Sequence, residues 1–399
     1  MDFNATVFHD DAPPGLSAAE LAKLADGVVE GISKAEAAQA SIDAPQVAAN
    51  WTLSNTVKLR TSLAAAISGT GYSTHVVLGD SLSSMFNGVT FDFANSWWRK
   101  LWRALIASGV PTAGTGRVAM SDFTGAPVDV AETSDSRISQ TGGWSHYDVA
   151  YGSPAGGGTV TFASDTPGTI VDVYYLSSGG PAFTVSIDGT PHTVTPTGDW
   201  HRAVDTTTGL SDTAHTVTVT AAADTADGVL LFGFRVRRTA GIAFDNFAIK
   251  YGIAANNQEN DAGDLTGSAL AQDYSSDADV LWIALGANDL GEERTPAQIV
   301  ADITGLRARW PDADCVLIIE PENVDYGTDY DNYVTAMRSL AVTLNVPLLD
   351  LSLRFGTNTQ LVAAGLGAPD DVHITTVAQS DWASVALDAV HSVGPRVLA

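Results

Sequence analysis

The stretch that decides the fold is His75-Val76-Val77-Leu78-Gly79-Asp80-Ser81-Leu82, in which an apolar run meets a Gly-Asp-Ser-Leu turn. The apolar run predicts a buried β-strand. A serine at the end of such a strand is held by a rigid element yet open to a cleft, as nucleophilic catalysis requires. Asp-Ser ahead of a helix is also an ordinary N-cap, so this turn alone leaves both interpretations of Ser81 open.

Two later stretches favour the catalytic interpretation. The apolar run 280–285 leads into Gly286-Ala287-Asn288-Asp289, where the Asn288 amide can face a cleft. Near the C-terminus, Asp370 stands three residues before His373. A carboxylate at that spacing can hold Nδ1–H of the imidazole and leave Nε2 free to take a proton from a serine. The three stretches together predict a site with Ser81, Asn288, Asp370 and His373.

A second Asp–His pair has the same spacing. Asp388 and His391 fall inside the last helical pattern, 381–391, where neighbours three residues apart are common on a solvated face. We therefore predict that Asp370 and His373, rather than this pair, act with Ser81.

Taken together, these motifs resemble blocks I, III and V of the GDSL, or SGNH, hydrolase family. The resemblance covers about residues 72–117 and 241–393. It implies a flavodoxin-like three-layer α/β/α fold and hydrolysis of esters, often acetyl or acyl esters on carbohydrates and lipids. It further implies a serine esterase that needs no cofactor and no metal. In such an enzyme the backbone N–H of Ser81, Gly252 and Asn288 would form the oxyanion hole.

The oxyanion glycine departs from the family pattern. Family members carry this block soon after the first helix, whereas here the stretch that looks like it, 241–253, arrives late. We favour Gly252 because it follows a strand-like run and precedes a helical pattern. Gly114 and Gly116, directly after the first predicted helix, are rivals, and each of the three could also be a plain turn glycine.

Composition excludes several classes of function. At 399 residues the chain predicts two to three domains, since a domain averages about 150 residues. No apolar run approaches the ~20 residues of a membrane span, and residues 1–5 show no start of a Sec signal. Cys315, the single cysteine, predicts a buried apolar side chain and excludes a disulfide within the chain. The net charge of −26 repels nucleic acid and anionic lipid, so neither is an expected partner.

The alternation of strands and helices is interrupted. A helix is predicted near 95–108, and the alternation resumes after 241 with strands near 280–285, 314–319 and 346–350 and helices near 296–309 and 329–343. Between 119 and 240 short alternating segments rich in Thr, Val and Gly predict an inserted all-β sandwich of the jelly-roll class. The expected organisation is an N-terminal helical segment (1–70), a hydrolase domain in two parts (71–118 and 241–399) and the insert (119–240).

The predicted insert resembles, in pattern only, the carbohydrate-binding-like β-domains attached to some carbohydrate esterases. Its aromatic and histidine side chains could stack on sugar, or could be core and edge residues; they are Trp144, His146, Tyr147, Tyr174, Tyr175, Trp200 and His201. The loop 224–228 could bind Ca²⁺, but we favour the interpretation as an acidic turn.

The N-terminal segment carries its own signals. Ser17 with Glu20 has the capping-box spacing, and Ala-rich helical patterns run to about Ala40 and return from about Leu53 to Ile67. Such a segment cannot bury its apolar stripe alone, so it packs on the hydrolase or on other copies in a homo-oligomer. Residues 11–21 loosely resemble the start of bacteriophage tail and baseplate proteins. This likeness predicts an esterase carried by a virion; otherwise the protein is cytoplasmic or secreted without a Sec signal.

The sequence thus predicts an esterase that removes small acyl groups, acetyl first, from a cell-surface carbohydrate. An inserted β-sandwich suits a polymeric glycan better than a lipid, and no basic amphipathic helix offers membrane contact. The alternatives are an acylhydrolase acting on lipid esters and a receptor-binding module with the hydrolase as scaffold. The chain has no Gly-x-Ser-x-Gly pentapeptide, and its eight histidines show no metal-ligand spacing.

Overall fold

The structure is a computed structural model. All the residues it describes belong to one compact unit, Val47–Ala399. They are residues 47–394 without 84–94, 115, 117, 120–136, 143, 148–149, 153–156, 178–179, 199–200, 222–228, 249–254, 256–273, 323, 325 and 369–371.

A central six-stranded sheet organises the hydrolase part. Its order is β1 (Ala48–Ala49), β17 (Leu348–Asp350), β16 (Asp314–Ile319), β15 (Val280–Ala284), β2 (Tyr72–Gly79) and β14 (Gly241–Asn246). All pairs are parallel except β1 with β17. Across the sheet from β14, the parallel strands are β14, β2, β15, β16 and β17. The strand that comes first in the chain, β2, therefore lies second in the sheet, as in flavodoxin-like folds.

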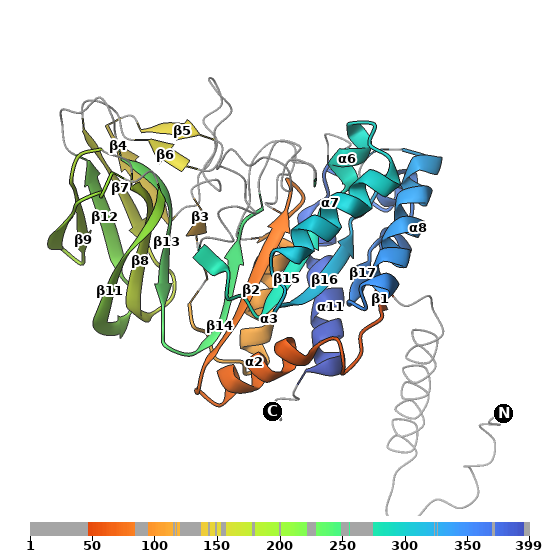
Figure 1. Cartoon of the computed structure of the whole chain (residues 1–399), viewed down its shortest axis with the longest axis horizontal. Helices are drawn as coiled ribbons and strands as arrows, with labels where there is room; N and C mark the ends of the chain where they lie inside the picture. The colour runs from red at the N-terminus through yellow and green to blue at the C-terminus, as the bar shows by residue number, and fades with distance from the viewer. Residues whose placement is uncertain are drawn as a thin grey trace, which may run out of the picture. The chain divides into compact units, whose positions relative to one another are not determined.

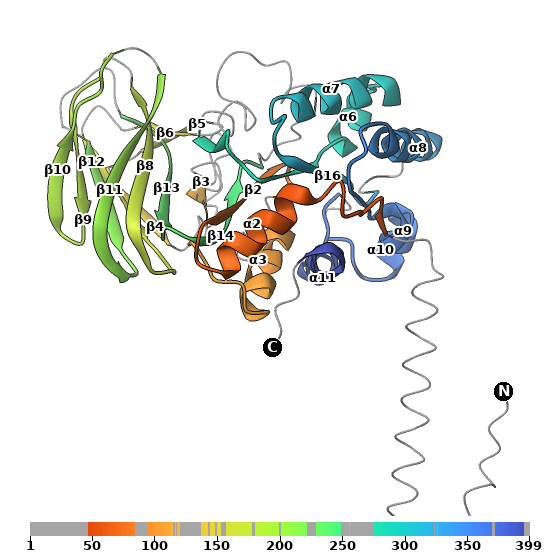
Figure 2. The ribbon, with the colours of Figure 1, turned by 60° about the horizontal axis from the view of Figure 1, so that its bottom comes forward.

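Helices cover both faces of this sheet, as Figures 1 and 2 show. One face packs against α7 (Pro296–Ala308) and α8 (Thr328–Thr343), and the other against α2 (Val57–Ile67), α3 (Trp97–Ala107) and α11 (Thr376–Val393). The shorter helices are α6 (Ala287–Gly291), α9 (Ser352–Phe355) and α10 (Asn358–Ala363). This layering confirms the predicted three-layer α/β/α class.

The apolar run before Ser81 explains why β2 lies in the middle of the sheet. Val76 and Leu78 belong to one core cluster and Val77 to the other, all fully buried. Successive side chains of a strand point to opposite faces, so a continuous apolar run suits a strand covered on both sides.

The insert forms two antiparallel sheets that share one core. One sheet has the order β10 (Thr190–Val194), β9 (Phe183–Ile187), β12 (Thr216–Ala221), β7 (Gly158–Ala163) and β4 (Ile138–Thr141). The other has β11 (His201–Thr213), β8 (Gly168–Ser177), β13 (Leu230–Arg237), β6 (Ala150–Gly152) and β5 (Ser145–Tyr147), and β3 (Val118–Ala119) pairs with β13. Alternate residues of both sheets, including the stacked Phe162 and Phe234, fill the space between them. This is a β-sandwich; its jelly-roll class stays a prediction.

The last part of the predicted N-terminal segment, residues 47–70, is not separate from the hydrolase. β1 extends the hydrolase sheet beside β17, and α2 packs its Leu59 and Leu63 into the hydrolase core. The backbone N–H of Leu59 also donates to the Asp314 carboxylate (2.8 Å). Residues 47–70 therefore belong to the hydrolase, because an amphipathic helix shows in sequence that it needs a partner but not which one. The predicted helix up to Ala40 lies outside the described residues.

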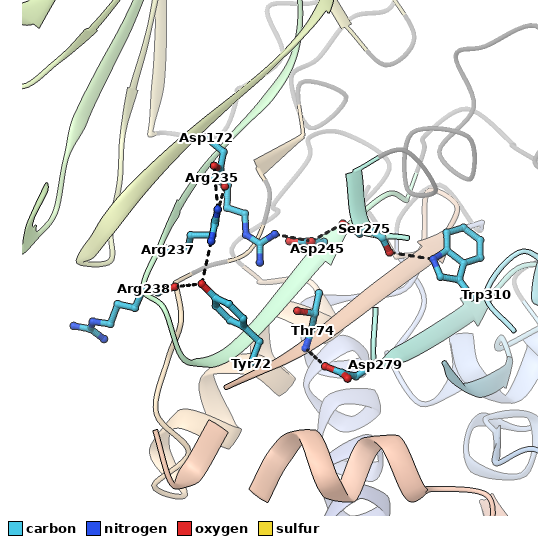
Figure 3. Close-up of polar contacts among 10 residues, drawn as sticks. All are labelled: Tyr72, Thr74, Asp172, Arg235, Arg237, Arg238, Asp245, Ser275, Asp279 and Trp310. Carbon is cyan, nitrogen blue, oxygen red and sulfur yellow. Dashed lines mark hydrogen bonds and ion pairs between the residues drawn. The ribbon is translucent and has the colours of Figure 1, made fainter. Parts of the chain in front are cut away.

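The insert packs closely against the hydrolase. Tyr174 and Phe232, on strands of the sandwich, are buried within the hydrolase core cluster. Figure 3 shows the polar part of this junction: Arg235 Nη1 pairs with the buried Asp245 (3.3 Å), which also accepts from Ser275 Oγ (2.7 Å). The two parts thus share one hydrophobic core and a buried ion pair. Within the described ranges, no helix combines the length and apolar character that a bilayer crossing requires.

Candidate active site

The predicted site lies where the strand order reverses. β2 and β15 are neighbours, and the chain continues from β2 to β14 on one side and from β15 to β16 on the other. In open α/β sheets this point leaves a crevice outside the carboxyl ends of the strands, where ligands bind. Ser81 follows β2 and Asn288 follows β15, so both stand at this crevice.

The turn that carries Ser81 is built around its neighbours. A side chain at Gly79 would bring its Cβ within 2.5 Å of the Ser83 side chain, so the position requires glycine. Asp80 is fully buried, and its Oδ1 accepts the backbone N–H of Leu82 (2.8 Å). Ser81 itself keeps 9% of its surface exposed.

Three side chains hold the same turn from the helical side. Trp97 Nε1 donates to Ser83 Oγ (3.1 Å), and Trp98 Nε1 donates to the Ser83 carbonyl (3.0 Å). Gln379 Nε2, on α11, donates to the Leu82 carbonyl (2.8 Å), while its Oε1 accepts the Trp97 N–H (2.7 Å). Sequence reasoning missed this support because a Gln and two Trp within helical patterns give no sign of their distant partners.

The structure brings His373 to Ser81. Nε2 of His373 lies 2.9 Å from Ser81 Oγ. The histidine stands in a short bridged loop, in which Ala368 N–H donates to the His373 carbonyl (2.7 Å) and Thr375 N–H to the Leu366 carbonyl (2.8 Å). Thr375 then caps α11. The imidazole is fixed by this loop within hydrogen-bonding distance of the serine.

Asp370 is the predicted partner of the imidazole. Asp370 lies outside the described residues, and its role as orienting acid stays a prediction. The other pair of the same spacing, Asp388 and His391, lies within α11 with both side chains exposed, His391 in the last turn. The contact with Ser81 Oγ comes from His373.

Asn288 and Asp289 point to different partners. Asn288 Nδ2 donates to Asp80 Oδ2 (2.6 Å), which ties the amide to the turn of the serine. Asp289 is fully buried, accepts the backbone N–H of Ala255 (2.7 Å) and lies 3.6 Å from Arg294 Nε. Gly286 before them has φ +128, and the Tyr333 ring occupies the place of its missing side chain.

The three candidate oxyanion glycines differ in their surroundings. Gly252 lies outside the described residues; β14, which precedes it, runs parallel to β2 and ends at the same edge of the sheet. At Gly114 a Cβ would meet the Val236 carbonyl oxygen at 2.1 Å, and at Gly116 the Phe244 carbonyl oxygen at 1.7 Å. Close packing of backbone therefore explains these two glycines without a catalytic role.

Buried carboxyl groups lie behind the serine turn. Asp80, Asp289 and Glu320 are all fully buried. Burial raises the pKa of Asp80, against the bond from Leu82 that lowers it. Burial and the neighbouring charge of Asp80 raise the pKa of Glu320 well above its ordinary value. Among the described residues no group of three acidic, histidine or cysteine side chains has a geometry that could hold a metal ion.

Of the side chains predicted to stack on sugar, His201 is the only described one that is exposed. Trp144, Tyr174 and Tyr175 are buried core residues. The side chains of His146, Tyr147 and Trp200, and the loop 224–228, lie outside the described part. A hollow of about 300 Å³ opens on this domain, lined by ten residues: Ile187, Asp188, Thr190, Pro191, His192, Thr207, Leu210, Ser211, Thr213 and His215.

Comparison with known proteins supports the architecture. No protein-family model and no curated protein matches the chain. Among solved structures, a peptidoglycan O-acetylesterase is similar over 87% of this chain and 99% of its own, with a TM-score of 0.62 and 14% identity. This similarity shows that the two proteins share a fold, the flavodoxin-like three-layer α/β/α arrangement described above.

Two further solved structures are similar at lower TM-scores. A family two carbohydrate esterase from Clostridium thermocellum has a TM-score of 0.31 at 16% identity, over 64% of this chain and 98% of its own. TesA has a TM-score of 0.38 at 12% identity, over 80% of this chain and 99% of its own.

Proposed function

We propose that the chain is a serine esterase that removes acetyl groups from a carbohydrate. The observation that carries the proposal is the 2.9 Å contact between Ser81 Oγ and His373 Nε2 at the reversal of strand order. A hydroxyl paired with an imidazole at such a crevice is the arrangement that acyl transfer requires. The similarity to a peptidoglycan O-acetylesterase supports the same chemistry.

In this mechanism Ser81 Oγ forms a bond to the ester carbonyl carbon, and its proton passes to Nε2 of His373. Ser81 N–H, Gly252 and Asn288 stabilise the oxyanion of the tetrahedral intermediate. The intermediate collapses as the imidazolium returns the proton to the leaving sugar oxygen. Water, activated by the same imidazole, then releases acetate from the serine. Asp370 would hold the imidazole in the required tautomer.

Ser81→Ala and His373→Ala test the proposal. Each should lower turnover of p-nitrophenyl acetate by several orders of magnitude, because neither the nucleophile nor the base can be replaced. The matched control is His391→Ala, which removes the exposed histidine of the other Asp–His pair and should leave turnover unchanged. Melting temperatures close to wild type show that the variants fold. Near-normal activity in Ser81→Ala would refute the proposal.

Acyl length separates this proposal from its main alternative. A series of p-nitrophenyl esters from acetate to palmitate, beside acetylated polysaccharides, should show highest kcat/KM for acetate and release of acetate from the polymer. Faster turnover of palmitate would replace the carbohydrate esterase with a lipid acylhydrolase. Binding to a cell surface that is the same in wild type and Ser81→Ala, without hydrolysis in either, would favour the receptor-binding module.

The β-domain, in this proposal, extends the surface that binds a polymeric substrate. Deleting residues 119–240 would be a poor test, because Tyr174 and Phe232 lie in the hydrolase core. The hollow offers a local change: Leu210→Trp should fill it, lower activity on polysaccharide and spare p-nitrophenyl acetate. If Leu210→Trp kept wild-type activity on both substrates, the hollow would have no part in binding the polysaccharide.

The biological setting rests on the sequence alone. Residues 1–46, which carry the likeness to phage tail proteins, lie outside the described residues. A virion-borne esterase, and a homo-oligomer through the N-terminal helices, remain proposals. Detection of the chain in purified virions, and its mass in solution with and without residues 1–46, would test them.

A further inference from the structure

Two buried carboxyl groups face each other behind the serine turn. Glu320 follows β16, its side chain is fully buried, and its polar neighbours are the Asp80 carboxyl and the backbone N–H of Ala287. Neither carboxyl oxygen of Glu320 has a well-formed hydrogen bond to a donor within the described residues. No ion pair in the described part of the chain includes Asp80 or Glu320. Two neighbouring buried carboxylates without a cation cannot both carry charge.

The donors around the pair decide which carboxyl keeps its proton. Asp80 accepts an N–H on each oxygen, from Leu82 on Oδ1 and from Asn288 on Oδ2. Those bonds favour its ionised form, since a carboxylate accepts hydrogen bonds better than a neutral acid. Glu320 faces fewer donors, with only the backbone N–H of Ala287 among the described residues, so the proton belongs on Glu320. Burial, and next the charge of Asp80, raise the pKa of Glu320 well above its ordinary value, in agreement with this placement.

We propose that Glu320 is a positioning residue, which as a neutral acid donates its O–H to the Asp80 carboxylate and so fixes Asp80 against Asn288. The inference rests on the proposed function, because Glu320 would act through the oxyanion donor. Asn288 gives one amide proton to Asp80, and this bond sets the direction of the other. A carboxylate that is itself held in place orients this amide more rigidly than one free to rotate.

Substitution of Glu320 separates its proton from its charge. Glu320→Gln keeps an acceptor for Ala287 N–H and a donor for Asp80, so kcat should stay within about fivefold of wild type. Glu320→Met removes the donor and should lower kcat by about 10–100-fold with little change in KM, the size expected when a catalytic group is displaced slightly. A kcat for Glu320→Gln as low as that of Glu320→Met, in folded proteins, would overturn the proposal.

The pH profile gives a readout that a merely structural role would not move. As the pH rises through the raised pKa of Glu320, its ionised form repels Asp80, and wild-type kcat should fall. The other titratable groups facing Glu320 are Asp80, Asp289 and three tyrosines, Tyr326, Tyr330 and Tyr333. Burial raises the pKa of each tyrosine, so the three tyrosines should stay neutral as Glu320 titrates. This fall in kcat should disappear in Glu320→Gln. The same fall in both proteins would show that another group causes it and would contradict the role of Glu320.

An infrared measurement tests the proton without any activity. At neutral pH the wild type should show the carbonyl stretch of a protonated carboxyl, and Glu320→Gln should lack it. Glu322→Gln is the matched control: Glu322 is also buried, but accepts the N–H of Tyr326 (3.2 Å) and of Asn358 (2.8 Å), so its change should leave the band. If the wild type lacked this band while its activity still depended on Ser81, the role of Glu320 would be refuted and the proposed function would stand. Failure of the proposed function would show instead as near-normal activity in Ser81→Ala.

Discussion

At the scale of single residues, Asn288 and Asp289 stand side by side but should differ in role. Asn288→Ala removes a proposed oxyanion donor and should lower kcat about 10²–10³-fold, or ~3 kcal/mol, with KM and melting temperature nearly unchanged. Asp289→Ala removes the acceptor of the Ala255 N–H and the partner of Arg294, so its main effect should be a lower melting temperature. Steady-state kinetics and thermal unfolding of both variants check this; the reverse pattern would make Asp289 the catalytic member.

The same scale shows which parts of the site a sequence can reveal. Ser81, Asn288 and His373 could be singled out because each is a reactive or polar residue next to an apolar run or a helix start. Glu320 and Gln379 could not, because their roles depend on partners distant in the chain: Gln379 and Leu82 lie 297 positions apart. A glutamate before a proline or a glutamine within a helix looks the same whether it supports a catalytic turn or faces solvent.

At the scale of elements, a buried histidine, His215, holds the turn of the β9–β10 hairpin. Nδ1 of the buried His215 lies 2.6 Å from the Asp188 carboxylate, and Nε2 lies 2.9 Å and 3.0 Å from the carbonyls of Gly168 and Ser211. Each ring nitrogen thus faces an acceptor, as an imidazolium requires. Burial lowers the pKa of His215, but the bonds to Asp188 and to Gly168 outweigh it and raise the pKa.

The sign of the resulting pH dependence follows from this shift. A raised folded-state pKa stabilises the protein fully below the unfolded value of about 6.5, and the contribution is lost as pH rises through the folded value. The melting temperature of wild type should exceed that of His215→Gln most at low pH, and the difference should shrink towards alkaline pH. A constant difference across pH would mean that His215 is neutral in the fold.

Local patterns predicted most elements but not their neighbours. The hairpin follows from alternating strands around Asp188-Gly189, whose φ values of +50 and +84 are those a two-residue type I′ turn needs. The order of strands in the two sheets, and the assignment of α2 to the hydrolase, depend on long-range packing that no local pattern encodes. The fold class could be predicted because the βα alternation allows few arrangements.

At the scale of the whole molecule, the ion pair of Arg235 with Asp245 joins the insert to the hydrolase. Arg235→Met should destabilise the protein by about 3–5 kcal/mol, because the Asp245 carboxylate stays buried without its cation. The double variant Arg235→Met with Asp245→Asn should recover part of that loss. Urea unfolding of the three proteins measures it; equal stability of the single variant and wild type would show that the pair does not hold the two parts together.

The position of the insert also has a consequence for synthesis on the ribosome. β2 emerges early, but both of its neighbours in the sheet, β14 and β15, are made only after the whole sandwich, β3 to β13. Within the described residues, the strands from β3 to β13 pair only with one another, apart from a bridge between Arg237 and Gly114. The two sheets of the insert can therefore form before β14 and β15 are made, while Tyr174 and Phe232 are buried against the hydrolase later. Ser81 and His373 are 292 positions apart, and the contact between them is among the last that the growing chain can form. A nascent chain halted before His373 should therefore carry a folded sandwich and no esterase.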